Sequence, residues 1–390
     1  MGAKYAVTKT IDEINKRIKQ GKAVVLNAEE MTEAVRKMGK EKAAKEVDVV
    51  TTGTFSPMCS SGMFFNIGQE PPMMRTSKVW LNDVPAYAGI AAVDAFLGAT
   101  EPDRDDPLNK VYPGQFKYGG GHVIEDLARG KAVRLKAASY GTDCYPRKEL
   151  EKDITLSDLP FAEILNPRNC YQNYNAAVNL TSRIIYTYMG PLKPSARNVN
   201  FATSGRLSPL FNDPYFLTIG LGTRIFLGGG VGYVLGAGTQ HVAAPKRNER
   251  GVPINPSGTL MLKGSLKQMN ARYLRGVSML GYGCSLAVGV GVPIPILNEE
   301  VAYYTGVDDS DILMPIKDYG HDYPQGLPRV LAHVPYEELK NGEVELVGKK
   351  VPTVPLTSYV LSLEIADTLK SWIEKGDFLL TQAQEEIPSS

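Results

Sequence analysis

The sequence has 390 residues and a formal net charge of +1, which argues against nucleic acid and anionic membranes as electrostatic partners. Hydrophobic residues make up 43% of the chain and charged residues 22%, as in ordinary globular proteins. The four cysteines form no C-x-x-C pair, which excludes a disulfide scaffold and a compact zinc site and suits a reducing cytoplasm.

The first fifty residues alternate between helical and strand patterns. A helix is expected from Thr10, with isoleucines on one face and charges on the other, and Gly21 ends it. Residues 23–26 are typical of a short buried strand, residues 28–38 of a second amphipathic helix and residues 47–52 of a second strand. This alternation predicts an α/β fold. The N-terminus lacks the apolar core of a signal peptide, and no apolar run reaches the length of a membrane span.

A glycine-bounded loop, residues 53–68, follows the second predicted strand and contains Cys59. The loop after the carboxyl end of a strand is where α/β folds usually bind ligands. Cys59 is therefore a candidate reactive thiol. A buried small residue in a packed loop is the alternative, and it fits the composition slightly better.

The next segments carry less chemistry. Residues 79–87 are typical of a strand leading into a turn, and residues 89–97 are expected to form a helix of small residues. The proline-rich stretch 101–114 is expected to be a surface loop. Its three aspartates could hold a cation, but a solvated loop is the better interpretation because the EF-hand spacing is absent.

Residues 118–147 contain the stronger candidate thiol. A triple glycine and His122 precede a short predicted helix, and a predicted strand at 132–140 leads into a polar loop with Cys144 and Arg147. A cation beside a cysteine raises its thiolate fraction, and the thiolate is the nucleophile. Because no base is visible nearby in the sequence, a half-buried thiol in a turn remains an equal alternative.

Residues 166–179, NPRNCYQNYNAAVN, are dense in amides and tyrosines. Amides and phenols make directional hydrogen bonds to carboxylate and carbonyl groups, so Asn173 is a candidate substrate ligand. A helix with an asparagine cap and an exposed polar face explains the run equally well. Cys170, within it, is interpreted as structural.

A proline-containing stretch, residues 189–200, separates this half from a glycine-rich second half. The glycine-rich run 228–243 could wrap phosphate with backbone amides, but it lacks the GK[ST] ending of a P-loop. His241 in that run is a candidate acid or base, although a core or turn histidine is more common. The four histidines show no metal-ligand spacing, so no metal site is expected.

Further patterns complete the second half. Strands are expected at 216–221 and 223–227, a helix-like stretch at 261–273 and a pair of glycine-spaced strands at 281–298; a charged hairpin is expected near 340–350 and a final amphipathic helix at 358–375. We therefore predict an α/β enzyme with a mixed sheet and glycine-rich loops. It is built from two intertwined halves, residues 1–190 and 191–390, which may be one domain.

Several long stretches resemble the homocysteine-biosynthesis (HcyBio) family. The resemblance is collinear from about residue 11 to residue 369 and therefore far more specific than any single motif. The stretches that carry it are DVVTTGTFSPMCSSGMFFNIG, KVWLNDVPAYAGIAAVDAFLGAT, YGGGHVIEDL, YGTDCYPRKE, NPRNCYQNYN, GAGTQH and LKGSLKQMNARYLRGVSMLGYG.

The resemblance implies a sulfurtransferase that makes L-homocysteine from L-aspartate semialdehyde and a reduced sulfur source. It implies that Cys144, in the TDCYPR motif, is the essential cysteine and that Cys59, in PMCSSG, is a second participant. Family members often carry CBS domains, for which this sequence ending at Ser390 leaves no room, so adenylate-type regulation is not expected. A ferredoxin-like partner would be a separate chain.

The residues then suggest a mechanism. Cys144 accepts sulfur as a persulfide or attacks the aldehyde, and two electrons are needed to reach the thiol, from an external donor or through Cys59. Arg147 and Arg206 are candidate ligands of the substrate carboxylate, and His122 and His241 are candidate proton carriers. We expect no bound cofactor, an external reductant, a sulfide or persulfide donor, and a cytoplasmic homo-oligomer.

Two other functional classes stay open. One is an enzyme that binds a CoA-like or phosphorylated ligand in the glycine-rich loops, with an activity independent of the thiolate. The other is a non-catalytic sulfur carrier, which would be loaded with persulfide without converting the aldehyde.

Overall fold

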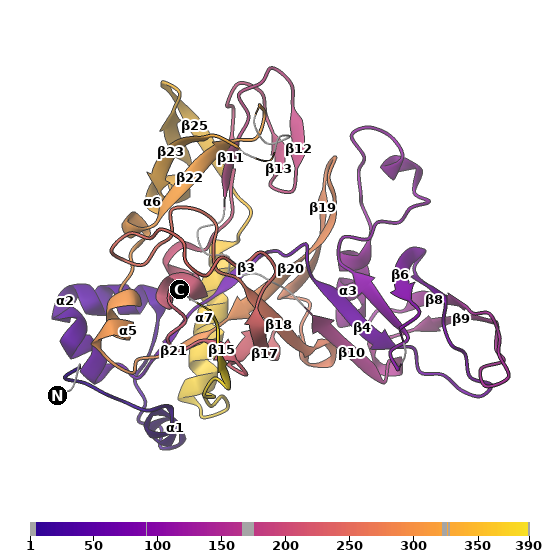
Figure 1. Ribbon diagram of the computed structural model, residues 1–390, viewed down its shortest axis with the longest axis horizontal. Helices are drawn as coiled ribbons and strands as arrows, with labels where there is room; N and C mark the ends of the chain where they lie inside the picture. The colour runs from indigo at the N-terminus through magenta and orange to yellow at the C-terminus, as the bar shows by residue number, and fades with distance from the viewer. Residues whose placement is uncertain (1–4, 91, 166–174, 322–325, 327, 389–390) are drawn as a thin grey trace.

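The computed structural model describes residues 5–90, 92–165, 175–321, 326 and 328–388. Figure 1 shows a helix-rich end, a large twisted sheet that extends away from it, and a second sheet above. The mixed α/β class predicted from the sequence is confirmed. Among the described helices, none combines the length and the apolar character needed to cross a membrane.

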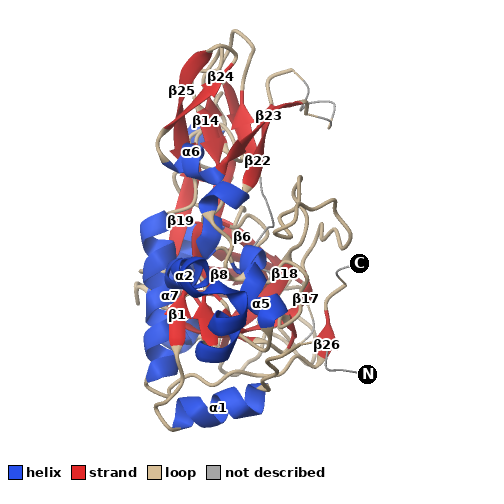
Figure 2. Cartoon of the chain, turned by 90° about the vertical axis from the view of Figure 1, so that its left-hand side faces the viewer, coloured by secondary structure: helices blue, strands red, loops and turns tan. Residues whose placement is uncertain are grey.

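The helix-rich end contains a small three-stranded sheet in which β2 pairs in parallel with β1 and antiparallel with β21. Figure 2 shows the helices gathered below the six-stranded sheet. Their termini follow local sequence rules, because Thr10 and Asn27 each form a capping box with the glutamate three residues later. The elements are α1 (Ile11–Lys19), β1 (Val25–Asn27), α2 (Ala28–Glu46), β2 (Val49–Thr51), β21 (Pro293–Pro295), α5 (Glu299–Tyr304) and α7 (Tyr359–Glu374).

The large sheet has thirteen strands in the order β19-β20-β16-β17-β18-β10-β4-β7-β6-β5-β8-β9, with β3 paired to β20. Helix α3 (Gly120–Ala128) packs against this sheet near β19 and β20, and α7 packs against β20 and β3. The strands are β3 (Thr54–Pro57), β4 (Gly62–Asn66), β5 (Lys78–Leu81), β6 (Val84–Ala88), β7 (Ala95–Gly98), β8 (Val133–Ala138), β9 (Glu149–Ile154), β10 (Phe161–Leu165), β16 (Arg224–Leu227), β17 (Gly230–Ala237), β18 (Leu260–Ser265), β19 (Leu274–Met279) and β20 (Gly283–Gly291).

The second sheet has six strands in the order β23-β22-β11-β14-β25-β24 and its own hydrophobic core. Its elements are β11 (Ala176–Val178), β14 (Val199–Phe201), β22 (Leu313–Asp318), β23 (Val330–Pro335), α6 (Tyr336–Lys340), β24 (Glu343–Leu346) and β25 (Lys349–Pro355). The remaining elements are the hairpin β12 (Ile185–Thr187) and β13 (Gly190–Leu192), the short helix α4 (Pro209–Asn212), and the pair β15 (Gly220–Leu221) and β26 (Glu385–Glu386).

Strands from the two halves of the sequence pair with each other in all three main sheets. Strand β2 pairs with β21, β10 with β18, and β11 with β22. A boundary after residue 190 falls inside the β12–β13 hairpin. The division into 1–190 and 191–390 stays a prediction, and the sheets are built jointly by both parts.

Two of the predicted helices are wrong. The C-terminal part of the helix expected at 89–97 is strand β7, which lies between β4 and β6. The helix-like stretch at 261–273 begins with β18, in which burial alternates residue by residue between β10 and β17. Small residues suggested a helix at 89–97 and polar residues suggested one at 261–273, but pairing with neighbouring strands outweighs these weak local preferences.

Candidate functional site

Cys59 lies on the tight turn that connects β3 to β4. The turn is held by the Met58 N–H, which donates to the Leu286 carbonyl at 2.8 Å, and by the Ser61 N–H, which donates to the Met58 carbonyl at 3.0 Å. The Cys59 side chain is partly buried. The Ser285 hydroxyl on β20 donates a hydrogen bond to the Cys59 sulfur at 3.3 Å, so the thiol has a fixed direction and one polar neighbour.

The triple glycine explains how α3 reaches this turn. A Cβ atom on Gly120 would lie 1.9 Å from the Gly98 carbonyl oxygen, and one on Gly121 would lie 2.0 Å from the Ser285 carbonyl oxygen. Any side chain at either position would therefore collide with backbone. The start of α3 is wedged between the end of β7 and β20, beside the residue that contacts Cys59.

Cys284, the neighbour of Ser285, is a buried packing residue. Its thiol donates weakly to the Phe116 carbonyl at 3.4 Å and to the Tyr118 carbonyl at 3.3 Å. Burial raises the pKa of Cys284 to about 11.

His122 lies on α3 over β19, and its Nε2 is 3.1 Å from the Ser278 hydroxyl. Burial lowers the pKa of His122, and its Nδ1 is buried with no hydrogen-bond partner among the described residues. Ser278 pairs with Cys284 in the β19–β20 ladder, so those two side chains share a face and Ser285 points to the other. His122 and Cys59 therefore approach β20 from opposite faces, and the structure records no contact between them within its described part.

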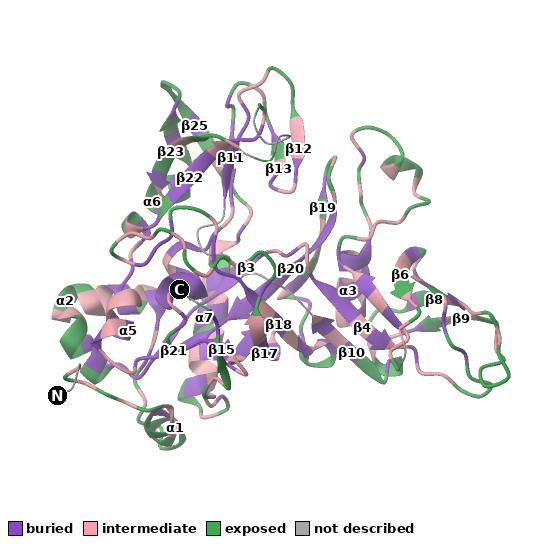
Figure 3. Ribbon diagram, viewed as in Figure 1, coloured by how far each residue is buried: buried purple, intermediate pink, exposed green. Residues whose placement is uncertain are grey.

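Cys144 is exposed on the loop between β8 and β9. Figure 3 shows this loop as a largely exposed end of the large sheet. The Ser139 hydroxyl donates to the Arg147 carbonyl at 2.8 Å, and the Arg147 N–H donates to the Met73 carbonyl at 3.3 Å, so the loop has a defined shape. Over the described chain, the Arg147 guanidinium has no ion-pair partner and stays free for a carboxylate.

The structure does not bring the two candidate thiols of one chain together. Three strands separate β4 from β8, which is about 19 Å at the usual strand spacing. Following the register, Phe64 of β4 lies in the same row as Ala138 of β8. Cys59 precedes that row and Cys144 follows it, so the thiols lie at opposite ends of the strands. A disulfide requires Cα atoms within about 7 Å.

Arg206, a predicted carboxylate ligand, is already paired inside the protein. Its guanidinium lies 3.2 Å from an Asp308 oxygen and 3.3 Å from an Asp309 oxygen, and only 20% of its side chain is exposed. These two ion pairs give Arg206 a structural role at the base of the six-stranded sheet. Its role as a substrate ligand stays a prediction without support from this geometry.

His241 has both ring nitrogens on backbone groups. Its Nδ1 accepts a hydrogen bond from the Thr259 N–H at 3.1 Å, and its Nε2 lies 2.7 Å from the Pro388 carbonyl. It anchors the C-terminal segment, and neither nitrogen is left for proton transfer. Asn173, the remaining predicted ligand, lies outside the described residues.

The glycine-rich run at 228–243 forms a hairpin and a strand, β16 to β17, and no helix begins after it. A Cβ atom on Gly232 would lie 2.7 Å from Leu227 Cβ, and one on Gly230 would lie 2.6 Å from the Gln268 carbonyl oxygen. These glycines allow close packing within the sheet. The arrangement offers no support for a phosphate-binding loop.

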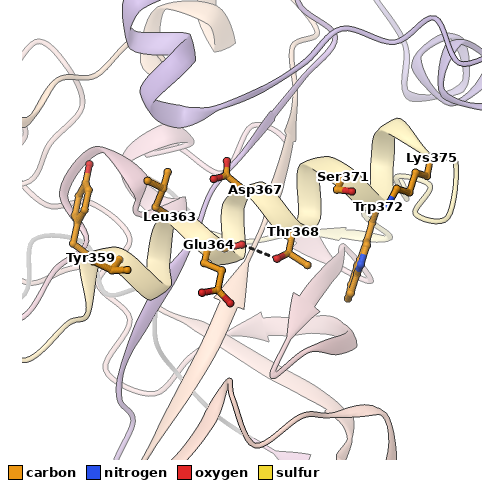
Figure 4. A pocket seen from close by; sticks show the side chains of 9 residues that line it. Tyr359, Leu363, Glu364, Asp367, Thr368, Ser371, Trp372 and Lys375 are labelled. Atoms are coloured by element: carbon orange, nitrogen blue, oxygen red, sulfur yellow. Dashed lines mark hydrogen bonds between the residues drawn. The ribbon is translucent and has the colours of Figure 1, made fainter.

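An open hollow of about 650 Å³ runs along α7 (Figure 4). It is lined by eight residues of α7 and by Lys375, which follows the helix, and none of these is a cysteine. Its carboxylates already have partners, since Asp367 accepts from Asn27 and Glu364 from Arg272. In the described chain, no group of three or more histidine, cysteine or carboxylate side chains could hold a metal ion, and the prediction of no metal site stays a prediction.

Sequence reasoning missed Ser285 and Ser278. Both lie on neighbouring strands whose pairing depends on residues far away in the chain, and a serine in a strand has no distinctive local pattern. The triple glycine before His122 was the available signal that another backbone approaches closely at this point.

Comparisons with known proteins extend over almost the whole chain. The family described as "Homocysteine biosynthesis enzyme, sulfur-incorporation" matches residues 23–380. The L-aspartate semialdehyde sulfurtransferase of Methanosarcina acetivorans is 49% identical over 384 residues, covering 98% of this chain and 72% of that protein. The protein of the same name from Methanocaldococcus jannaschii is 49% identical over 389 residues, covering 96% and 72%. No solved structure matches significantly.

We predict that Gly121→Ala destabilises the fold by at least about 2 kcal/mol, because the new methyl group must displace the backbone at Ser285. Urea unfolding measures the loss. Gly130→Ala is the matched control, since its φ is +73° but a Cβ there meets nothing within 4 Å, and it should cost only about 1 kcal/mol. Equal losses in the two variants would contradict the close-packing explanation.

We also predict a pH effect from His122. Because burial lowers its pKa below the ordinary value, the unfolded chain binds more protons, and the free energy of unfolding falls as pH drops below about 6.5. In His122→Gln, which cannot titrate, the loss between about pH 7 and about pH 5 should be smaller than in wild type. Urea unfolding at the two pH values measures this loss in each protein. The same loss in His122→Gln and in wild type would show that His122 does not contribute.

Proposed function

The chain belongs to the family of homocysteine biosynthesis enzymes of the sulfur-incorporation type, and we propose that it converts L-aspartate semialdehyde to L-homocysteine with Cys144 and Cys59 as its working thiols. The enzyme class and the substrate rest on one observation, the 49% identity to two L-aspartate semialdehyde sulfurtransferases over nearly the full chain. The roles of individual residues, the sulfur source and the reductant are our proposal.

The electron balance explains why one thiol is not enough. Hydrogen sulfide adds to the aldehyde carbon, and loss of water leaves a thioaldehyde, with no change in total oxidation state. Conversion of that C=S group to the CH₂–SH group of homocysteine requires two electrons and two protons. Two cysteine thiols that become a disulfide supply this amount.

In the proposed sequence, the Cys144 thiolate attacks the sulfur of the thioaldehyde. An S–S bond forms, the π electrons of C=S move to the carbon, and the carbon takes up a proton. Cys144 and homocysteine are then joined as a mixed disulfide. The Cys59 thiolate attacks the Cys144 sulfur, breaks that bond and releases homocysteine as its thiolate, which is protonated.

The cycle closes when an external dithiol or electron-transfer protein reduces the Cys59–Cys144 disulfide. Arg147 lies three residues from Cys144 in the same loop, and its unpaired guanidinium is suited to hold the substrate carboxylate through two parallel hydrogen bonds. The exposure of Cys144 gives sulfide and reductant direct access. No bound cofactor is required by this scheme.

We predict a stoichiometric burst. Reduced protein, freed of small reductants and given L-aspartate semialdehyde and sulfide without oxygen, should release about one homocysteine per chain and lose about two titratable thiols. Mass spectrometry of the product and thiol titration of the protein measure both numbers.

Two variants separate the roles of the thiols. Cys144→Ala should release nothing and keep its thiols. Cys59→Ala should hold homocysteine as a disulfide on Cys144, which added dithiothreitol sets free. A full burst from Cys144→Ala would refute the proposed role of this cysteine. A stable persulfide on Cys144 with no conversion of the aldehyde by wild type would instead favour a sulfur carrier.

A further inference from the structure

The proposed function demands that Cys59 and Cys144 exchange a disulfide, and the fold of one chain keeps them at opposite ends of the strands. Figure 1 shows the β8–β9 end of the large sheet far from β3, and Cys59 lies on the turn that follows β3. We propose that the active site is completed between two copies of the chain. The Cys144 loop of one subunit docks at the Cys59 turn of its partner.

The Cys144 loop, residues 139–148, has the character of a docking element. Tyr140 is 85% exposed and Tyr145 is 42% exposed, on either side of the exposed thiol. Aromatic side chains with little cover on a shaped loop are typical of interface anchors.

The loop is also basic. It contains two cations and one carboxylate, and the exposed Arg75, Lys78 and Glu149 next to it bring the local net charge to +2. Lys78 pairs with Ala138 at the foot of the loop, and Arg75 follows Met73, which holds the loop's backbone. Within the described chain, these four cations have no carboxylate partner. The charged residues of the loop and its surroundings are Arg75, Lys78, Asp143, Arg147, Lys148 and Glu149.

A complementary surface lies beside Cys59. The loop 99–118 begins there, because the Ala99 N–H donates to the Ser61 carbonyl at 2.8 Å, and it returns on the other face of β20, where the Cys284 thiol donates to the Tyr118 carbonyl at 3.3 Å. This loop carries four carboxylates and three cations, a net charge of −1. The loop's tip exposes 56% of Val111 and 82% of Tyr112.

Each thiol thus has its own projecting loop, and the two loops match in charge and in aromatic character. Opposite charges steer the encounter and fix its register, while the exposed tyrosines supply buried area. In a dimer with twofold symmetry, the contact made by one Cys144 loop is repeated by the other. The pairing therefore produces two identical sites, each with Cys144 from one subunit and Cys59 from its partner.

The chemistry is unchanged in atoms and electrons but crosses the interface. The mixed disulfide forms on Cys144 of one subunit, and the Cys59 thiolate of the partner attacks that Cys144 sulfur and releases homocysteine. The two subunits are then joined by a disulfide, which the external dithiol or electron-transfer protein reduces. A monomer would stop at the mixed disulfide.

The decisive experiment uses heterodimers purified through two different affinity tags. A heterodimer of Cys59→Ala with Cys144→Ala retains one complete site of two, so it should give about half the wild-type burst per chain. The reciprocal heterodimer joins wild type to the double variant Cys59→Ala/Cys144→Ala and has no complete site, so it should give no burst. A site within one chain predicts the opposite result for both.

The readouts keep this inference separate from the proposed function. No burst from the wild-type homodimer would refute the proposed function itself. If wild type gives a burst but the heterodimer of Cys59→Ala with Cys144→Ala gives none, only the shared site is refuted. A full burst from a chain that is monomeric by light scattering would also refute it, and would point to a separate reductant protein as the partner of the Cys144 loop.

A second measurement does not depend on activity. Mild oxidation of reduced wild type with diamide should give a covalent dimer on a non-reducing gel, and peptide mass spectrometry should find Cys59 joined to Cys144. Either single alanine variant should abolish the covalent dimer, and Cys284→Ala should keep it because that thiol is buried. A covalent dimer that persists in Cys59→Ala, or none in wild type, would overturn the inference.

Discussion

The close contact between the start of α3 and two backbone carbonyls is the constraint on which this architecture depends. Gly120 and Gly121 bring the helix against the end of β7 and against β20, strands that come from the two halves of the sequence. The contact fixes the β3–β4 turn between them and aligns Ser285 with the Cys59 sulfur. There is no space for a methyl group at either glycine. Any displacement of α3 must therefore also displace the β3–β4 turn and β20.

Helices with clear capping residues could be predicted from local sequence. Strands were harder to predict, because they depend on pairing with segments far away in the chain. Thr10, Asn27 and Ser358 cap helices whose starts follow from a few neighbouring residues. The strand β18 was missed because its neighbours, β10 and β17, are distant in the sequence. The separation of the thiols was equally out of reach, since it depends on the register of four successive strand pairs.

The candidate site shows the same limit at the level of single residues. Cys59 and Cys144 were found from their loops and from a family resemblance. Arg206 and His241 were chosen by residue type alone. In the structure Arg206 is paired with two carboxylates, and His241 contacts two backbone groups. A guanidinium or an imidazole looks equally reactive in a sequence whether or not its hydrogen bonds are already made, because its partners come from other elements.

The buried Cys284 thiol has a consequence for selectivity among the cysteines. With its pKa raised to about 11, this thiol stays protonated at neutral pH. Disulfide exchange proceeds through thiolates, so this sulfur is kinetically silent although it is adjacent in sequence to the serine that contacts Cys59. Burial therefore keeps Cys284 out of the disulfide exchange that we propose for Cys59 and Cys144.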